Sequence, residues 1–496
     1  MSDTALPTAA PARAAGADSR KWLALILLCV TQFIVVLDVA IVNVALPSIQ
    51  SALDFSTENL QWVVSAYALT FGGFLLLGGR VADLLGRRRV FMAGLVVFSL
   101  ASLAAGLSQS EGMLITARAI QGMGAAIISP AALSILMTMF EEGPERNKAL
   151  GIWGAVAGMG GAAGVLAGGI LTDLAGWEWI FFVNVPVGAA VLLLAPRLLR
   201  ESRIEVERRR FDVAGAITVT GSLSLLVYAL VKSNDYGWGS ARTLLVIAAS
   251  AVLMAAFILI ERRTKAPMLP LGLFRNRVLT GANVVGFMLG AAIFSMFFFL
   301  SLYMQQVLGY SALKTGIAYL LVALIIVVSA AASQALVTRF GIRWILAIGM
   351  GLLTLGILWF TMVSVDGSYA VDLVPGFILS GIGLGFSFVP DSIAALTGVR
   401  ERQAGVASGL INTSQQIGGA LGVALLLTVA TNRSTTLAGE GQSRVEATVG
   451  GFQYAFAVGA GLALLGLLAT LFLIRSRAGE PAPAEEPSRE PAVARD

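Results

Sequence analysis

The chain lacks histidine and has a single cysteine among its 496 residues. Without histidine, imidazole catalysis, imidazole metal ligation and histidine proton relays are excluded, so proton chemistry falls to carboxylates. Cys29 cannot form a disulfide within the chain and is expected to pack as a small hydrophobic residue. No lysine follows a glycine, which excludes a Walker-type phosphate loop. We therefore expect neither a metal nor an organic cofactor.

Charge is also scarce. The chain is 13% charged and 57% hydrophobic, with a mean hydropathy of +0.83, whereas an ordinary soluble domain has about 25% charged residues. The net charge of +5 lies in short segments between apolar runs, which is typical of membrane topology signals. Most of the chain is therefore expected to lie in a lipid bilayer, and nucleic acid is not an expected partner.

The apolar runs define the organisation, because a stretch of about 20 apolar residues crosses a bilayer as a helix. They lie near 22–46, 60–79, 90–107, 112–133, 150–171, 179–196, 213–231, 243–260, 278–303, 312–337, 344–363, 371–397, 404–430 and 452–474. This predicts an all-α membrane protein with 14 helices in a 6+2+6 arrangement. The expected units are six-helix bundles at 21–196 and 278–475, two extra helices with charged linkers at 197–277, and disordered tails at 1–20 and 476–496.

The positions of lysine and arginine indicate the orientation. If the N-terminus is cytoplasmic, 28 of the 34 basic residues lie on the cytoplasmic side, five lie outside, and Arg118 lies within a span. Cytoplasmic loops carry such an excess. The composition, rich in arginine and alanine, indicates a GC-rich bacterium. We therefore expect a multi-pass protein of the bacterial inner (plasma) membrane with both termini in the cytoplasm.

Asp38 is a carboxylate near the middle of the first apolar run. An ionised side chain in a transmembrane helix costs about 2.5 to 3.5 kcal/mol on insertion scales, and such residues usually face a wet cavity and carry protons or ions. Asp38 therefore predicts a proton-coupled carrier. Carboxylates at span ends, such as Asp173 and Asp212, are expected to be solvated.

A loop between the second and third spans has the sequence GRVADLLGRR over 79–88. A glycine at Gly86 allows a tight turn, and the basic cluster favours the cytoplasm. The loop resembles the G-x-x-x-D-x-x-G-R-[KR] signature of the major facilitator superfamily, which implies a role in conformational change for Gly79, Asp83, Gly86, Arg87 and Arg88. The alternative is a cytoplasmic anchor that does not move.

The fourth span contains LITARAIQGMGA, which is similar to the superfamily motif L-x-x-x-R-x-x-Q-G-x-G-A and includes Arg118, Gln121 and Gly122. A guanidinium in a membrane needs a carboxylate, carbonyl groups or water nearby. The resemblance implies that Arg118 couples proton binding at Asp38 or another carboxylate to conformation. The alternative is a structural arginine that binds carbonyl groups.

The fifth span resembles the antiporter signature G-x-x-x-G-P-x-x-G-G through Gly160, Gly164, Gly168 and Gly169. Small residues four apart allow close helix contact. Val165 stands where the signature has proline, so the kink that the signature implies is in question.

The run 37–47, LDVAIVNVALP, resembles the motif of fourteen-span drug:proton antiporters of the EmrB/QacA type, with Ala40 in place of threonine. The segments 177–186 and 267–277 also match this family, which the chain resembles from about residue 22 to 475. The resemblance implies proton coupling by Asp38 with Arg118. Asp391, in the twelfth span, is a candidate second site for a proton or a cationic drug, or else simply a hydrated residue near a helix end.

Polar and aromatic side chains within spans are candidates for an apolar substrate pocket with a few polar anchors. The alternative is that they pack or anchor helices at the membrane interface. The candidates are Asn43, Tyr67, Trp153, Phe294, Tyr303, Gln305, Asn412 and Gln416.

The sequence thus predicts a proton-coupled antiporter that exports hydrophobic or cationic drugs from the cytoplasm by alternating access, acting as a monomer and powered by the proton gradient. A first alternative is a proton-coupled exporter of one endogenous metabolite, such as an antibiotic, siderophore or amino acid. An importer or a membrane sensor is a second alternative. An enzyme is not expected, because no nucleophile, metal or phosphate constellation is present.

Overall fold

The computed structural model describes residues 12–140, 144–202, 212–264, 267–399 and 404–474, and this part of the chain is helical without strands. The first half consists of α1 (Ala12–Leu53), α2 (Thr57–Leu60), α3 (Trp62–Leu85), α4 (Arg87–Gly106), α5 (Glu111–Met139), α6 (Pro144–Leu174), α7 (Trp179–Phe182) and α8 (Asn184–Leu198). A hairpin of α9 (Val213–Tyr236) and α10 (Ala241–Arg263) follows. The second half consists of η1 (Leu271–Arg275), α11 (Arg277–Leu302), η2 (Tyr303–Val307), α12 (Ala312–Phe340), α13 (Ile342–Trp359), η3 (Phe360–Met362), η4 (Tyr369–Leu373), α14 (Val374–Leu396), α15 (Ala404–Gly439) and α16 (Arg444–Leu473).

The predicted spans correspond to these helices. In the described part of the chain, 13 helices are long and apolar enough to cross a membrane. The remaining predicted span, 150–171, falls within α6, whose segment Met159–Leu174 is apolar. The all-α fold of about 14 membrane helices is therefore confirmed. α1 begins at Ala12, inside the segment 1–20 that we expected to be a disordered tail, whereas residues 1–11 and the tail 476–496 lie outside the described residues.

The helix ends follow from local capping chemistry. The hydroxyl of Ser110 accepts a hydrogen bond from the amide of Met113 at the start of α5. Ser443 and Glu446 form a reciprocal capping box at the start of α16. Such side chains satisfy amides that lack a partner within the helix. Each cap therefore fixes where a helix begins after a polar loop.

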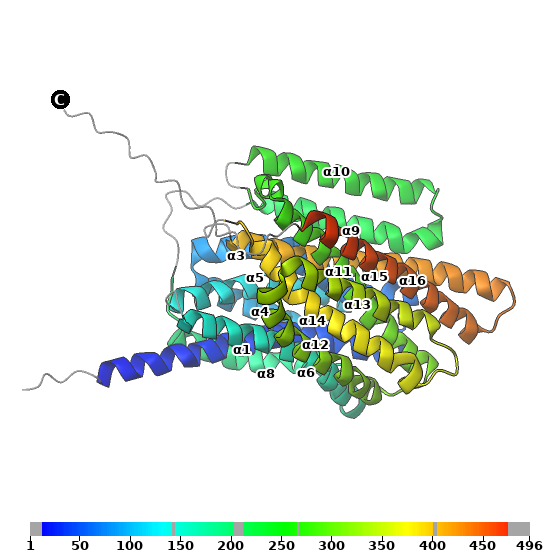
Figure 1. Ribbon diagram of the computed structural model, residues 1–496, viewed down its shortest axis with the longest axis horizontal. Coiled ribbons are helices and arrows are strands. Elements are labelled where there is room, and N and C mark those ends of the chain that lie inside the picture. The colour runs from blue at the N-terminus through cyan, green and yellow to red at the C-terminus, as the bar shows by residue number, and fades with distance from the viewer. Residues whose placement is uncertain (1–11, 141–143, 203–211, 265–266, 400–403, 475–496) are drawn as a thin grey trace, which may run out of the picture.

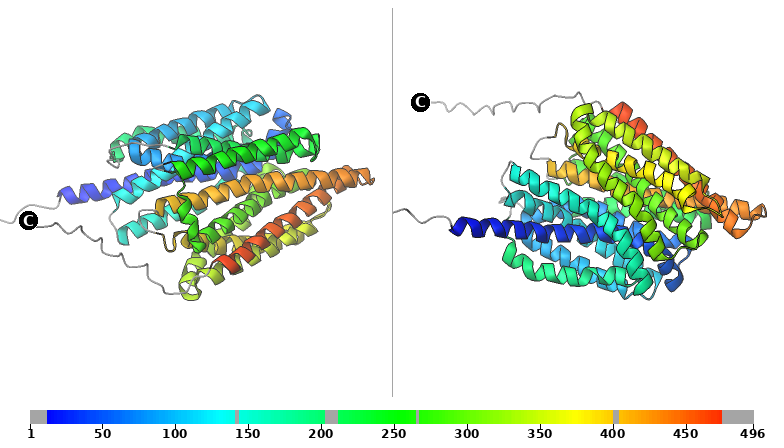
Figure 2. Two further views of the ribbon diagram at one scale, coloured as in Figure 1. Left: turned by 90° about the horizontal axis from the view of Figure 1, so that it is seen from above. Right: turned by 60° about the horizontal axis from the view of Figure 1, so that its bottom comes forward.

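The helices form two bundles, one from α1, α3–α6 and α8 and the other from α11–α16 (Figure 1). The α9–α10 hairpin lies along one flank of the molecule, where α9 packs against α3 and α15 (Figure 2). α10 packs chiefly on α9 and is largely exposed, as expected for a helix in contact with lipid. α9 thus contacts both bundles on that flank.

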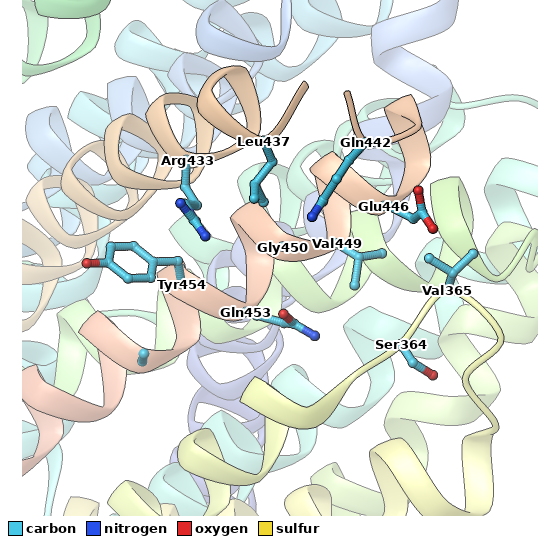
Figure 3. Close-up of a pocket in the computed structure, with 11 residues that line it drawn as sticks. Ser364, Val365, Arg433, Leu437, Gln442, Glu446, Val449, Gly450, Gln453 and Tyr454 are labelled. Carbon is cyan, nitrogen blue, oxygen red and sulfur yellow. The ribbon is translucent and has the colours of Figure 1, made fainter. Parts of the chain in front are cut away.

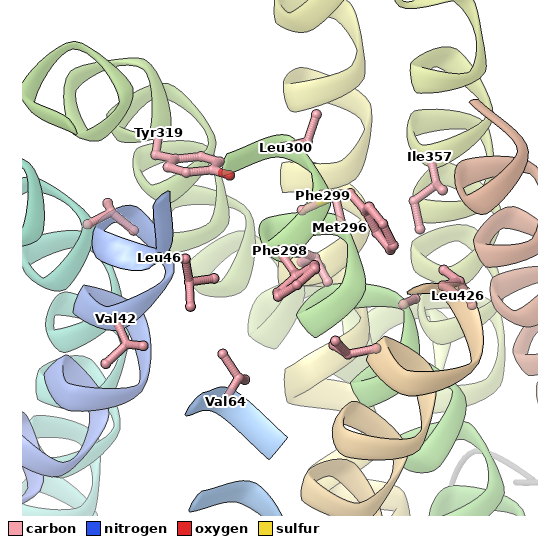
Figure 4. Close-up of a cluster of buried hydrophobic side chains, with 14 of the residues drawn as sticks. Val42, Leu46, Val64, Met296, Phe298, Phe299, Leu300, Tyr319, Ile357 and Leu426 are labelled. Carbon is pink, nitrogen blue, oxygen red and sulfur yellow. The ribbon is translucent and has the colours of Figure 1, made fainter. Parts of the chain in front are cut away.

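We call the side of the molecule where α1 begins and α16 ends the tail side, and the opposite side the far side. The bundles meet mainly through α6 with α12, α3 with α15 and α1 with α11. Between them, Val42 and Leu46 of α1 and Val64 of α3 belong to the same buried cluster as Phe298 and Phe299 of α11 (Figure 4). An apolar layer therefore lies between the two bundles.

Candidate functional site

Asp38 lies at the centre of a buried hydrogen-bond network within the first bundle. Its side chain has no exposed surface. Oδ2 accepts a hydrogen bond from Nη1 of Arg118 at 2.6 Å. Oδ1 accepts one from Nε2 of Gln121 at 2.7 Å and one from Nδ2 of Asn184 at 2.8 Å. The carboxylate is therefore paired with a cation and further satisfied by two amides, the arrangement that a buried charge requires.

Arg118 is equally well satisfied and 1% exposed. Its Nε donates to the carbonyl of Val63 at 2.9 Å, and Nη1 also donates to Oε1 of Gln121 at 2.8 Å. The guanidinium lies 4.4 Å from the ring centroid of Tyr67 and 5.6 Å from that of Phe181. Cation–π contacts of this kind add to the ion pair when water is excluded. Arg118 therefore binds a carboxylate and a backbone carbonyl at the same time, and its coupling role stays a prediction.

Ser102 completes the network. Its hydroxyl accepts hydrogen bonds from Nε2 of Gln121 at 3.2 Å and Nδ2 of Asn184 at 3.0 Å, and donates to the carbonyl of Phe181 at 2.8 Å. Neither Ser102 nor Asn184 is among the residues predicted from the sequence, and Gln121 is predicted there only as part of the conformational motif. Asn184 lies in the segment 177–186, so a buried amide in that motif was the available signal. Ser102 has no comparable signal in the sequence.

The network lies toward the far side. Asn184 is the first residue of α8, and Arg118 is seven residues from the start of α5, about 10 Å along the helix axis. Both helices begin on the far side. The site is thus held by α1, α4, α5 and α8, four helices of one bundle.

The glycines of α6 face two different partners. A Cβ added to Gly160, Gly164 or Gly168 would lie 2.7–3.1 Å from atoms of α1, and for Gly164 and Gly168 these include backbone atoms within three residues of Asp38. A Cβ on Gly169 would instead lie 2.7 Å from the carbonyl oxygen of Ala312 in α12. The ladder therefore joins the Asp38 helix to the contact between the bundles, as small residues allow.

The loop 79–88 forms hydrogen bonds chiefly within its own bundle, although Nη1 of Arg80 also donates to the carbonyl of Pro267 at 3.5 Å. Asp83 Oδ1 accepts hydrogen bonds from Nε of Arg87 at 2.9 Å and from the hydroxyl of Ser134 at 3.1 Å. Gly86 has a φ of 114°, a conformation that favours glycine. Glu201, beyond α8, accepts hydrogen bonds from the amides of Arg88 and Arg89 at the start of α4. Glu201 is a further residue of this loop's surroundings that the sequence did not reveal.

Asp391 lies in the second bundle, apart from the Asp38 network. Its side chain is fully buried, and neither carboxylate oxygen has a hydrogen-bond partner among the described residues. The expectation of a hydrated helix-end residue is thus not met in this conformation. The expectation that Asp212 is solvated is wrong, because it is 3% exposed and its Oδ1 caps α9 through the amide of Gly215. Asp173 is exposed, but it accepts hydrogen bonds from the amides of Ala312 and Leu313 across the bundles.

The predicted substrate residues are dispersed over both bundles. Tyr67 packs under Arg118, Tyr303 donates to the carbonyl of Ser364, and Gln305 donates to the carbonyl of Val44. Asn43 and Asn412 donate to backbone carbonyls one turn earlier in their own helices. Trp153 and Phe294 pack against buried apolar clusters. Gln416 has a buried amide nitrogen without a hydrogen-bond partner among the described residues. A hollow of about 480 Å³ on the far side involves none of them (Figure 3). A substrate site at these residues therefore remains a prediction.

Two bundles of membrane helices around buried polar residues define a multi-pass membrane transporter fold. A model of the Major Facilitator Superfamily matches residues 28–423, so the chain belongs to this family and is a transporter and not an enzyme. It is similar to the puromycin resistance protein pur8 of Streptomyces alboniger, with 40% identity over 93% of each chain. It is also similar to the cephamycin export protein CmcT of Amycolatopsis lactamdurans, with 41% identity over 82% of this chain and 84% of that one.

Other relatives agree with this assignment. The multidrug resistance protein Stp of Mycobacterium tuberculosis strain H37Rv is 37% identical over 79% of this chain and 73% of that one. A solved bacterial homologue of the human lysosomal transporter Spinster has a TM-score of 0.65, with 15% identity over 92% of this chain and 98% of that one. This last likeness supports the fold alone.

Proposed function

We propose that the protein exports antibiotics or other hydrophobic or cationic drugs from the cytoplasm by alternating access, as a monomer in the bilayer. The observation that carries this proposal is its similarity, over most of its length, to proteins named for antibiotic export and resistance. The absence of histidine leaves carboxylates as proton carriers, which fits transport driven by the proton gradient.

The buried Asp38–Arg118 pair supports proton coupling. Its hydrogen bonds join α1, α4, α5 and α8, while the glycines of α6 pack on the same stretch of α1. Protonation of Asp38 would therefore affect the packing of α6 on α1, and a change in that packing would affect the protonation of Asp38. One proton supplies about 1.4 kcal/mol per pH unit and about 2.3 kcal/mol per 100 mV, enough to concentrate a substrate about tenfold per pH unit.

The distribution of basic residues supports a cytoplasmic tail side. On the far side, hydrogen bonds join the two bundles: Asp173 binds the start of α12, and Gln306 Nε2 donates to Gln50 Oε1 at 2.8 Å. With the tail side in the cytoplasm, these bonds hold the external side closed. Opening of the tail side, with these bonds intact, would let the transporter accept its substrate from the cytoplasm.

A second candidate function is export of one metabolite made by the producing cell. It is favoured by the relatives named for single compounds, the puromycin resistance and cephamycin export proteins. The two candidates differ in substrate breadth and share the proposed mechanism.

The test is a drug panel in cells that lack their own pumps, with resistance and accumulation measured with and without an uncoupler. Export of several drugs that an uncoupler abolishes supports the first candidate, and export of one compound supports the second. Asp38→Asn should lose uncoupler-sensitive export, whereas Asp54→Asn, the same exchange at an exposed site just after α1, should retain it. Uphill, proton-dependent export by Asp38→Asn would contradict the role of Asp38.

A further inference from the structure

The two membrane carboxylates, Asp38 and Asp391, are in opposite electrostatic situations in the same conformation. Asp38 accepts hydrogen bonds from a guanidinium and two amides. Asp391 is as deeply buried, yet both of its oxygens lack a hydrogen bond and it forms no ion pair within the described ranges. This difference needs a chemical explanation, because buried polar groups are ordinarily satisfied.

The surroundings of Asp391 are mostly apolar. A Cβ added to Gly286 of α11 would lie 3.1 Å from its Oδ2 and 2.6 Å from Cδ1 of Ile411 in α15, so the carboxyl group fills the space that this glycine leaves. The side-chain amide of Gln415 is a polar neighbour, but outside hydrogen-bonding geometry. Charged residues of the elements packed around α14 lie near helix ends in the described part of the chain, at Arg277, Lys314, Arg339, Arg343, Asp372 and Arg433.

An ionised carboxylate in such a place has no compensation for its lost hydration, which amounts to several kcal/mol, whereas a neutral acid avoids most of that cost. Asp38 is in the reverse situation, because its two oxygens accept hydrogen bonds from Arg118 and from two side-chain amides. We propose that Asp391, and not Asp38, holds the exchanged proton in this conformation. This inference rests on the proposed proton-coupled export and assigns the proton to one carboxyl group.

The depth of Asp391 fits release of that proton on the tail side. It lies five residues before the end of α14 on that side, about 8 Å along the helix axis, whereas the Asp38 network lies toward the far side. When the tail side opens, the O–H bond of Asp391 breaks and the proton passes to water, which leaves the carboxylate hydrated. When the far side opens, the carboxylate takes a proton from water on that side and becomes neutral again.

The first test counts protons in liposomes containing the full chain, with the membrane potential held at zero. Puromycin and ethidium serve as probes, and the logarithm of their accumulation ratio is plotted against the pH difference. Each exchanged proton contributes about a tenfold accumulation per pH unit. Asp391→Asn should lower the slope by one unit relative to wild type, while Asp372→Asn, at the far-side end of the same segment, should leave it unchanged.

An unchanged slope in Asp391→Asn would overturn the inference while leaving proton-coupled export intact. If the wild-type protein shows no gradient-driven accumulation of either probe, the proposed function itself fails. The folding of Asp391→Asn is checked by exchange of labelled for unlabelled probe without a gradient, which needs no net proton movement.

The second test is independent of transport by the variant. Dicyclohexylcarbodiimide reacts with neutral carboxyl groups in apolar surroundings, so wild-type protein in liposomes is treated with it and the labelled peptides are identified by mass spectrometry. We expect label at Asp391 at least tenfold above that at Asp38. Label at Asp38 with none at Asp391 would overturn the assignment even if Asp391→Asn fails to fold.

Discussion

Gly169 offers a sharp test of how the bundles separate. In Gly169→Ala the new Cβ would lie 2.7 Å from the carbonyl oxygen of Ala312 and 2.9 Å from Cα of Leu313, both backbone atoms that cannot rotate away. Across the same contact, a Cβ added to Gly316 would lie 2.6 Å from the carbonyl oxygen of Val165. The overlap would therefore push α6 and α12 apart on the far side.

Overpacking of this kind costs about 1 to 3 kcal/mol. Because the cost applies only while α6 and α12 touch, it should shift the equilibrium toward the state that is open on the far side by about five- to 150-fold. Gly161→Ala is the matched control: it makes the same change in the same helix, but nothing lies within 4 Å of the added Cβ. Both variants change helix propensity equally. A difference between them in the population open on the far side therefore reports the contact between α6 and α12.

The assay is a distance measurement by pulsed electron paramagnetic resonance. Spin labels are placed at Leu174 and Lys314, exposed residues at the adjoining ends of α6 and α12, in a chain with Cys29→Ser. Gly169→Ala should increase the population with the longer distance, while Gly161→Ala should match the parent. Identical distance distributions in the two variants would refute the reasoning.

Three further substitutions test single ion-pair and hydrogen-bond contacts. Arg118→Met should leave Asp38 without its cation and lower stability by about 3 to 5 kcal/mol, seen as a lower unfolding temperature in detergent, and adding Asp38→Asn should restore part of it. Asn184→Ala should lower stability by about 1 to 3 kcal/mol in the same assay, because Asp38 and Ser102 each lose an amide donor. An unfolding temperature equal to that of the wild type would contradict this prediction. Glu201→Ala should cost about 0.5 to 2 kcal/mol by removing the cap of α4, with faster hydrogen exchange at the amides of Arg88 and Arg89 as the specific readout; unchanged exchange would contradict it.

The sequence by itself determined the membrane class, the number of spans and the candidate coupling residues. Apolar runs of about 20 residues have few alternatives to membrane helices, because every backbone polar group must be satisfied in lipid. Asp38 and Arg118 were identifiable individually, since an ionisable residue within a span is costly and therefore functional or paired. Motif resemblance also led to the correct family.

Only the tertiary structure decided which of these residues meet. Asp38 binds Arg118, Gln121 and Asn184 at sequence separations of 80, 83 and 146, and these contacts depend on the rotation and depth of four packed helices. For the same reason the sequence did not reveal that Gly164 and Gly169 face different bundles. It also could not distinguish a paired carboxylate at Asp38 from an unpartnered one at Asp391, because both read as an acidic residue in an apolar helix and only the neighbouring helices supply or withhold the cation.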